Sequence, residues 1–410
     1  MAVLPVSVIV VSRHRPEALL RCITALRQQD HPQVELIVVA DPEAARIAGD
    51  ALRAEGLAAK VTAFDEANIS AARNLGLLQA AGAVVAFIDD DAVAEPSWLS
   101  RLTAPFGDAA VVAATGFVRG RNGISYQWRA CEVDALAQDH PFEADAVTLR
   151  AGTAQRAVKT QGTNCAFRRD ALLQIGGFDA ALRFFLDEAD VNLRLAPLGL
   201  TAVVPDAQVH HGYLASARRR PDRVPLDLFE IAASTAVFLR RHAPDCDLDA
   251  ARQRLWQEQG DRVAAHRRAG RLTAAEAQAL MQGLQLGWTE GLARPVAALG
   301  RLAPTEPPPF LVLPGTGPRA GLVIAGRSWH RARLLTRARQ AVASGRIVTV
   351  FCLSPGFRRH QHIFCPEGYW LQTGGQFGQS VRSGPKLRLM PFSQRIRDEM
   401  NRIFQFRPIN

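Results

Sequence analysis

The sequence predicts an α/β fold: a mostly parallel sheet with helices on both faces, then a helical module and a small α/β domain. Over the first 120 residues, short β-branched runs alternate with amphipathic helical segments through short connections, which is typical of parallel sheets. Between 223 and about 299, the apolar residues recur with helical spacing instead. Strand and helix patterns return after a proline-rich segment.

The first part of the chain supplies the sheet. Most of the predicted strands are short apolar runs, and several are rich in valine and isoleucine. Pro16 stands near the first turn of the first helix, where proline is tolerated because its nitrogen needs no partner there. We predict strands at 6–11, 34–39, 60–63, 83–88, 110–118 and 201–204, and helices at 16–29, 42–54, 69–81 and 96–105.

Composition divides the chain into four parts. We predict a sheet domain at 1–222, a helical module at 223–300, a linker at 301–320 and a basic α/β domain at 321–410. Six prolines between 303 and 318 are typical of a semi-rigid linker. In the last domain we expect strands at 321–326 and 347–353 around a basic helix, with another helix at 393–404.

The net charge of +10 comes entirely from the C-terminal quarter. Residues 301–410 hold 17 Lys and Arg against 4 Asp and Glu, whereas residues 1–300 hold 32 against 35. Such asymmetry favours contact with a polyanion or an anionic membrane surface. A basic face that only aids solubility is the alternative.

Cysteine spacing and hydropathy indicate the compartment. The six cysteines lack the spacing of a disulfide framework, which favours reduced thiols. The apolar start of the chain has neither a preceding basic region nor a small-residue cleavage site, so we interpret it as a strand and not a signal peptide. No apolar stretch reaches 18 residues, so no transmembrane helix is expected. We therefore expect a cytoplasmic protein.

Three consecutive carboxylates, Asp89-Asp90-Asp91, directly follow the apolar run 83–88. They would lie at the carboxyl edge of the sheet, where open α/β sheets bind their ligands. Carboxylates at such an edge suit Mg²⁺ or Mn²⁺. A solvated acidic turn is the alternative for a motif of this kind standing alone.

Two strand ends place further polar residues at the same edge, and the helix 69–81 adds two more candidates. Ser12 ends the first predicted strand and Asp41 the second, and an aspartate there can accept a hydrogen bond from a base or a ribose hydroxyl. Asn68 is predicted to cap the helix 69–81. Arg73, about one turn into that helix, can reach a diphosphate. A surface arginine is the alternative interpretation of Arg73.

A last group of segments runs from Gly162 to Arg169, from 176 to 179 and from 184 to 194, where Asp187-Glu188-Ala189-Asp190 precedes Arg194. In this order and spacing, the segments make residues 3–215 resemble an inverting family 2 glycosyltransferase with the GT-A fold. The resemblance leaves the basic C-terminal domain unassigned. The letters DEAD at 187–190 do not indicate a helicase, because the chain has no G-x-x-x-x-G-K-[ST] loop.

The resemblance implies roles for the donor-side residues. Ser12 and Asp41 match positions that contact the nucleotide base and ribose, and Arg73 matches an arginine near the base and diphosphate. Asp91 is implied as a direct metal ligand. Asp89 or Asp90 is implied as the ribose contact, and Asp89 is also a candidate ligand.

The resemblance also implies a base and a further metal ligand. The catalytic base is implied to be Glu188, with Asp187 as the alternative, because the family usually has an aspartate at the position of Glu188. His211 is implied as a metal ligand, with His210 in second place; a plain polar histidine is the alternative. Asp190 and Arg194, at i and i+4, are expected to pair structurally.

The implied reaction moves a sugar from a nucleotide-sugar donor to an acceptor hydroxyl, with Mn²⁺ or Mg²⁺ as cofactor. One carboxylate must take the acceptor proton, and a cation must neutralise charge on the departing diphosphate. The acceptor is expected to be a polysaccharide, a lipid-linked saccharide or a protein. Residues 321–410 are expected to contact the cytoplasmic membrane or an acidic glycan, and nucleic acid is not expected. The alternatives are a nucleotidyltransferase on the same sheet and a non-catalytic scaffold that binds a polyanion.

Overall fold

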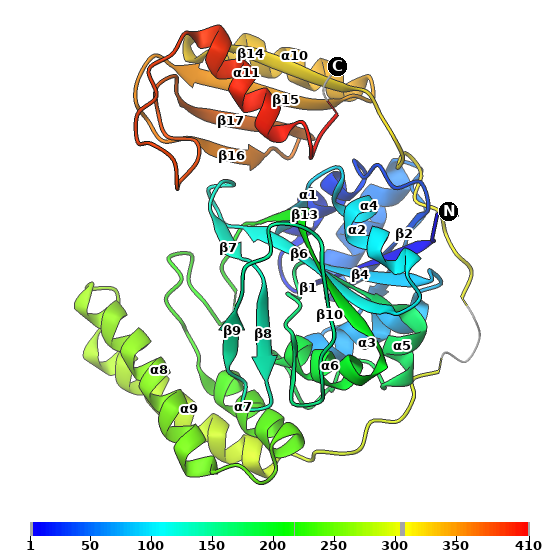
Figure 1. The fold of residues 1–410 in the computed structure, drawn as a ribbon, viewed down its shortest axis with the longest axis vertical. Coiled ribbons are helices and arrows are strands. Elements are labelled where there is room, and N and C mark those ends of the chain that lie inside the picture. Colours follow the sequence, from blue (N-terminus) through cyan, green and yellow to red (C-terminus); the bar gives the residue numbers. More distant parts are fainter. Residues whose placement is uncertain (1–2, 217, 304–307, 409–410) are drawn as a thin grey trace.

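A ten-stranded mixed sheet forms the centre of the first half of the chain (Figure 1). The structure is a computed structural model that describes residues 3–408 except 217 and 304–307. The strands are β1 Val6–Ser12, β2 Val34–Ala40, β3 Lys60–Ala63, β4 Val84–Asp89, β5 Ala92–Ala94, β6 Val111–Arg119, β7 Tyr126–Trp128, β10 Thr148–Arg150, β12 Cys165–Arg168 and β13 Leu200–His211. Their order is β10-β13-β6-β12-β4-β1-β2-β3, with β5 on β13 and β7 on β6.

Strands β3, β2, β1 and β4 pair in parallel, and β12 runs antiparallel to both β4 and β6. Buried side chains from α1 (Pro16–Leu26), α2 (Pro42–Ala54) and α4 (Trp98–Thr103) form the core on one face of the sheet. Those from α3 (Ile69–Gln79), α5 (Arg169–Gln174) and α6 (Asp187–Leu195) form the core on the other. The predicted α/β sheet with helices on both faces is confirmed.

Several elements differ in length from the prediction, and in two of them a proline accounts for the difference. The helix expected at 96–105 begins only at Trp98, and its last turn becomes a 3₁₀ helix, Ala104–Gly107, around Pro105. The strand expected at 201–204 continues to His211, because a register irregularity after Val204 accommodates Pro205 within the strand. This continuation carries His210 and His211 to the carboxyl edge of the sheet.

The helical module consists of α7 Phe229–His242, α8 Leu248–Arg268 and α9 Ala274–Ala293. Helices α7 and α9 approach closely because α9 presents glycines. A Cβ at Gly287 would lie 2.0 Å from the carbonyl oxygen of Phe229, and one at Gly291 would lie 2.4 Å from that of Ala233. A three-stranded sheet, β8 Cys131–Asp134, β9 Asp139–Pro141 and β11 Arg156–Val158, and α7 share a small apolar core with α6.

The C-terminal domain has a four-stranded sheet in the order β14-β15-β17-β16, from β14 Gly321–Arg327, β15 Ile347–Ser354, β16 Gln361–Phe364 and β17 Tyr369–Gly375. Helices α10 (Arg331–Ala343) and α11 (Phe392–Ile403) contribute to separate apolar clusters with this sheet. Figure 1 shows this domain and the helical module at opposite ends of the molecule. Among the described residues, none of the helices combines the length and apolarity needed to cross a membrane.

The described residues between α9 and β14 lie along the outside of the sheet domain (Figure 1). Residues 304–307 of the predicted linker lie outside the described residues. Beyond them the chain adheres to the sheet domain: the Leu313 amide donates to the Val34 carbonyl at 2.7 Å and the Gly317 amide to the Gln29 carbonyl at 2.9 Å. Leu313 is fully buried, so this part of the segment is docked instead of free.

Candidate active site

A cavity of about 390 Å³ opens at the carboxyl edge of the sheet, beside the ends of β1 and β2 and the start of α3. Val11, Val39 and Phe64 contribute apolar walls, and the same cavity is lined by a set of basic side chains. An apolar wall next to cations suits a ligand that combines a ring with anionic groups. The basic residues of the lining are Arg13, His14, Arg15, Arg183 and Arg218.

Ser12 and Asp41 stand at this edge, as their strand positions predict. The carboxylate of Asp41 caps α2 by accepting from the Ala44 amide at 3.2 Å, and it also accepts from the His14 amide at 2.6 Å. The Ser12 hydroxyl lines the cavity and donates to Asp90 Oδ2 at 2.6 Å. Their contacts with a base or ribose stay predictions.

Asp90 requires a correction. The residue is fully buried and lies against Arg15, whose Nη2 is 2.6 Å from Asp90 Oδ1. Burial raises the pKa of Asp90 to about 7, although the charge of Arg15 opposes the rise. A ribose contact by Asp90 does not fit this position, because the side chain has no exposed surface. The side chain of Asp89 is 31% exposed and is the candidate that remains.

Asp89, Asp91 and His211 come together. Their candidate ligand atoms all lie within 4.8 Å of one another, the only such group among the described residues. The Nε2 atom of His211 is 3.2 Å from Asp91 Oδ1, while its Nδ1 atom is 3.0 Å from Gln127 Oε1. Burial disfavours ionisation of Asp91, but the hydrogen bond and charge of His211 hold the pKa below its usual value. Two carboxylates and an oriented imidazole fit a divalent cation such as Mn²⁺.

His210 points away from this group, because neighbouring side chains on a strand alternate between faces. Its Nε2 atom is 2.7 Å from Glu95 Oε1, and both side chains are buried. The second-place prediction of His210 as a metal ligand is therefore wrong. The residue belongs instead to the contact between the sheet domain and the C-terminal domain.

Glu95 joins these two domains. Arg407 donates from Nε to Glu95 Oε2 at 2.6 Å and from Nη2 to Oε1 at 2.7 Å, in a buried bidentate pair. The same guanidinium lies 2.8 Å from His362 Nε2 and 3.7 Å from the centre of the Trp370 ring. Through Arg407, the C-terminal domain thus contacts Glu95. Glu95 in turn contacts His210, the residue directly before His211.

Arg73 connects the acidic groups of the site. It is 3% exposed, so the surface-arginine alternative is wrong. Its guanidinium donates to Asp187 and, at 3.0 Å, to Glu188 Oε1, and it lies 3.7 Å from Asp89 Oδ1. Arg73 therefore bridges the start of α6 and the carboxylate that ends β4.

The two carboxylates that begin α6 differ in environment. Burial and the neighbouring charge of Glu188 raise the pKa of Asp187 well above its usual value. Burial opposes ionisation of Glu188 as well, but Arg73 brings the pKa of this residue below its usual value. The side chain of Glu188 is 22% exposed, whereas that of Asp187 is 2% exposed. Glu188 is the ionised and accessible member of the pair.

The backbone around Glu188 is also specialised. Leu186, directly before α6, is buried and has a φ of 65°, a left-handed conformation that is costly for a leucine. A Cβ at Gly162 would lie 1.7 Å from Glu188 Oε1, so only glycine leaves room for this carboxylate. Sequence reasoning placed Gly162 in an informative segment without identifying this role.

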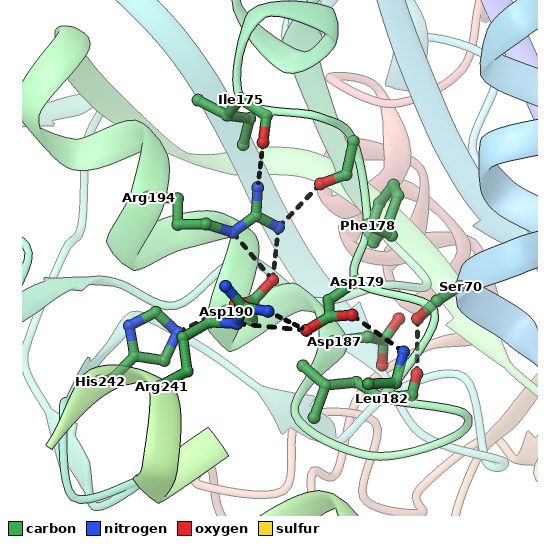
Figure 2. Close-up of polar contacts among 12 residues, drawn as sticks. Ser70, Ile175, Phe178, Asp179, Leu182, Asp187, Asp190, Arg194, Arg241 and His242 are labelled. Atoms are coloured by element: carbon green, nitrogen blue, oxygen red, sulfur yellow. Dashed lines mark hydrogen bonds and ion pairs between the residues drawn. The ribbon is translucent and has the colours of Figure 1, made fainter. Parts of the chain in front are cut away.

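Figure 2 shows how Asp190 anchors α6. Asp190 accepts from Arg194 Nε at 3.0 Å, as predicted, and also pairs with His242 at 2.9 Å. Arg194 donates further to the carbonyls of Ile175 and Gly177, and Arg241 pairs with Asp179 at 2.6 Å. Arg241 and His242 belong to α7, so the helical module supports the helix that carries Glu188.

A sequence model described as "Glycosyltransferase like family 2" matches residues 4–221, which is more than half of the chain. The chain belongs to this family. All residues of the candidate site, from Ser12 to His211, lie within the matched range. The parallel run β3-β2-β1-β4, followed by carboxylates and the antiparallel β12, agrees with the GT-A fold expected of a family 2 glycosyltransferase.

Individual relatives of this family 2 chain are distant. A glucosyl-dolichyl phosphate glucuronosyltransferase of Haloferax volcanii is 27% identical over 180 residues, which cover 42% of this chain and 56% of that protein. The chain thus spans little more than half the length of this curated relative.

The similar solved structures include GalNAc-T7 with UDP, GalNAc and Mn²⁺ (16% identity, TM-score 0.42, 58% of this chain and 48% of that chain). They also include residues 1–349 of S. aureus TarS in complex with UDP (18% identity, TM-score 0.43, 72% of this chain and 83% of that chain).

Proposed function

We propose that this chain is a metal-dependent, inverting glycosyltransferase that moves a sugar from a nucleotide-sugar donor to an acceptor hydroxyl. The observation that carries the proposal is the arrangement around Arg73, which holds an ionised Glu188 close to Asp89. Membership of family 2 supports the same reaction class. The cavity of about 390 Å³, with apolar walls and basic side chains, is the proposed donor site.

In the proposed reaction, Glu188 accepts the proton of the acceptor hydroxyl as that oxygen attacks the anomeric carbon. The new C–O bond forms while the bond to the diphosphate oxygen breaks, so a single displacement inverts the anomeric configuration. Arg73 orients Glu188 and keeps it ionised. The set Asp89, Asp91 and His211 would hold the Mn²⁺ or Mg²⁺, which when bound neutralises charge on the departing diphosphate.

We further propose a saccharide or a lipid-linked saccharide as the acceptor. The name of the Haloferax relative, a glucosyl-dolichyl phosphate glucuronosyltransferase, points in that direction. The proposal also includes a polysaccharide or a protein as the acceptor, because the resemblance implies these classes as well. We propose a cytoplasmic location, with peripheral attachment to the cytoplasmic membrane; the six free thiols and the basic residues of 321–410 support it.

A thermal-shift screen with UDP, GDP, CDP and dTDP, each with and without Mn²⁺, tests the donor site. A ligand that binds only the folded protein at 100 times its Kd adds about 2.7 kcal/mol of stability. We expect one nucleotide to raise the melting temperature only in the presence of Mn²⁺, and Asp91→Asn to abolish this rise. No response to any nucleotide would contradict the proposal and favour the non-catalytic scaffold.

The second test separates transfer from the rival reactions. The wild-type protein should release nucleoside diphosphate from the matching nucleotide sugar, whereas a nucleotidyltransferase would release pyrophosphate from a nucleoside triphosphate. Glu188→Gln should retain the thermal shift and lose turnover. A Glu188→Gln protein with full activity would remove Glu188 as the base.

A further inference from the structure

A second cavity, of about 740 Å³, lies between the sheet domain and the C-terminal domain. Residues 95, 119, 123–126 and 129 line it from the sheet domain, and residues 362, 381–383, 401–403, 405 and 406 line it from the C-terminal domain. The two sides are joined where the His362 amide donates to the Asn122 carbonyl at 2.9 Å. Figure 1 shows β7 facing the β16 edge of the C-terminal domain at this junction. We call this cavity the basic cleft.

The basic cleft carries a strong positive charge. Four arginines line it, from both domains, and Glu95 is the only carboxylate among the lining residues. The charge of Glu95 is already neutralised by the bidentate pair with Arg407. The cleft therefore has an excess of cations over anions. The four arginines are Arg119, Arg129, Arg382 and Arg402.

Two of these arginines have no carboxylate within ion-pair distance in the part of the chain that the structure describes. Arg119 donates to Gln208 Oε1 at 2.6 Å and to the Ile124 carbonyl at 2.7 Å. Arg382 donates to the carbonyls of Gln379 and His360. These neutral partners fix the guanidinium groups in place without cancelling their charge.

The ring of Tyr126 orients the sheet-domain side of the cleft. The guanidinium of Arg119 lies 4.6 Å from the ring centre and that of Arg129 lies 5.0 Å from it. Arg129 Nη1 lies 3.9 Å from Glu143 Oε2, in an exposed pair that screens little of its charge. Arg129 therefore keeps most of its charge available at the mouth of the cleft.

The electrostatic cost of this arrangement is visible in the pKa of the arginines. Burial and then the charges of Arg359 and Arg402 lower the pKa of Arg382. Burial lowers the pKa of Arg402 as well, with Arg119 adding to the effect and Glu399 opposing it. A bound oxyanion would relieve this repulsion between like charges.

We propose that the basic cleft binds carboxylate or phosphate groups carried on an anionic saccharide. Guanidinium groups match both kinds of oxyanion in bidentate geometry. The volume is in the range of sites that hold an extended small molecule and exceeds the need of a single ion. The arginines line a concave space between two domains, which a flat membrane surface cannot enter. The choice of a saccharide as the carrier rests on the proposed function, whereas the charge of the ligand does not.

The position of the cleft defines its relation to the candidate active site. Glu95 and His362 line the cleft, and both contact His210 at the interface between the two domains. His211 points to the opposite face of β13, towards Asp91. The saccharide segment bound in the cleft therefore lies on the other side of β13 from the proposed metal site, and it would tether the chain that is being modified.

Isothermal titration of the full-length protein tests the proposal with galacturonate tetramer as the carboxylate probe, glucose 6-phosphate as the phosphate probe and maltotetraose as the neutral probe. We expect at least one anionic probe to bind and the neutral probe not to bind. The double variant Arg129→Gln/Arg382→Gln should weaken binding by at least about tenfold per lost charged contact.

The matched control is Arg333→Gln/Arg337→Gln, which removes the same charge from exposed positions on α10. This control should change the affinity by less than about twofold, because neither arginine lines the cleft. Equal weakening in the two double variants would overturn the proposal, because it would indicate non-specific attraction to a basic domain. Failure of both anionic probes to bind would also overturn it.

Two further measurements complete the test. If the double variant does not fold, Arg129→Gln alone serves, since that side chain is 54% exposed. Flotation with phosphatidylglycerol vesicles that depends on Arg129, and that galacturonate tetramer does not compete, would replace the saccharide with a membrane and overturn the proposal. No step requires sugar transfer, so failure of the proposed transferase activity would leave the binding result interpretable.

Discussion

Replacement of Arg407 by methionine should detach the C-terminal domain from the sheet domain at modest denaturant concentration. Arg407 is fully buried, and Glu95 is 2% exposed. Methionine keeps part of the apolar stem but removes both hydrogen bonds to Glu95, at 2.6 and 2.7 Å. Breaking a buried ion pair by removing one partner costs about 3–5 kcal/mol, because the remaining charge stays buried. His210 still contacts Glu95, so we expect a loss near the lower end of this range.

Urea unfolding followed by tryptophan fluorescence measures this loss, since the Trp370 ring centre lies 3.7 Å from the Arg407 guanidinium and reports on the interface directly. The matched control is Arg339→Met, which breaks the exposed Arg339–Glu367 pair of the same domain at 3.3 Å. An exposed pair contributes about 1 kcal/mol or less. A loss in Arg407→Met no greater than in Arg339→Met would refute the reasoning.

The same pair predicts a pH dependence with a definite sign. Burial would raise the pKa of Glu95, but Arg407 and His210 lower it to about 2. The stability that Glu95 contributes is therefore present above its unfolded pKa of about 4.5 and is lost as the pH falls through about 2. In Arg407→Met the loss should begin at a higher pH. The double variant Glu95→Gln/Arg407→Met should recover part of the stability, because no buried charge remains unpaired.

Three further outcomes follow from the site and the C-terminal domain. Glu188→Gln should lower the turnover number about 100-fold to 10,000-fold with little change in nucleotide affinity, measured by diphosphate release and thermal shift. Gly162→Ala should abolish turnover, because its Cβ would lie 1.7 Å from Glu188 Oε1 and 2.3 Å from Arg73 Nη2; full activity, measured by diphosphate release, would contradict the role of Gly162. Burial lowers the pKa of His360 to about 4, so the stability it contributes is present above about 6.5 and is lost as the pH falls through about 4. Urea midpoints at pH 7 and pH 5 should differ less in His360→Gln than in wild type.

Local sequence patterns were sufficient to predict the long buried strands of the sheet domain and one helix cap. Strands β1, β2 and β4 were recognisable because each is a buried apolar run that alternates with segments of helical spacing. Asn68 was recognisable as an N-cap, and its side chain accepts from the Ala71 amide at 3.1 Å. Strands β16 and β17 were missed, since Gln361–Phe364 and Tyr369–Gly375 mix polar and apolar residues without clear alternation. The three-residue strands are too short to leave any periodic signal.

The site was predictable where a residue's role follows from its own strand or helix. Asp190 and Arg194 were paired by helical spacing, whereas Asp91 and His211 were assigned to one metal site by the resemblance to family 2 glycosyltransferases. The burial of Asp90 was not predictable, because it depends on Arg15 from another element. Arg73 presents the same difficulty: its partners at 187 and 188 lie more than 100 residues away, and no spacing rule connects them.

His210 and His211 show what a sequence motif leaves undecided. Two adjacent histidines at the end of a strand have the same chemistry, and either one offers a nitrogen to a metal. Their positions on opposite faces of β13 separate them: His211 meets Asp91 and Gln127, whereas His210 meets Glu95 and, through it, Arg407. Glu95 and Arg407 are 312 residues apart in the sequence, so their ion pair forms only because the C-terminal domain is docked on the sheet domain. The strand that presents the proposed metal ligand is therefore also the strand on which the C-terminal domain rests, and a disturbance of that domain has a direct physical route to the candidate active site.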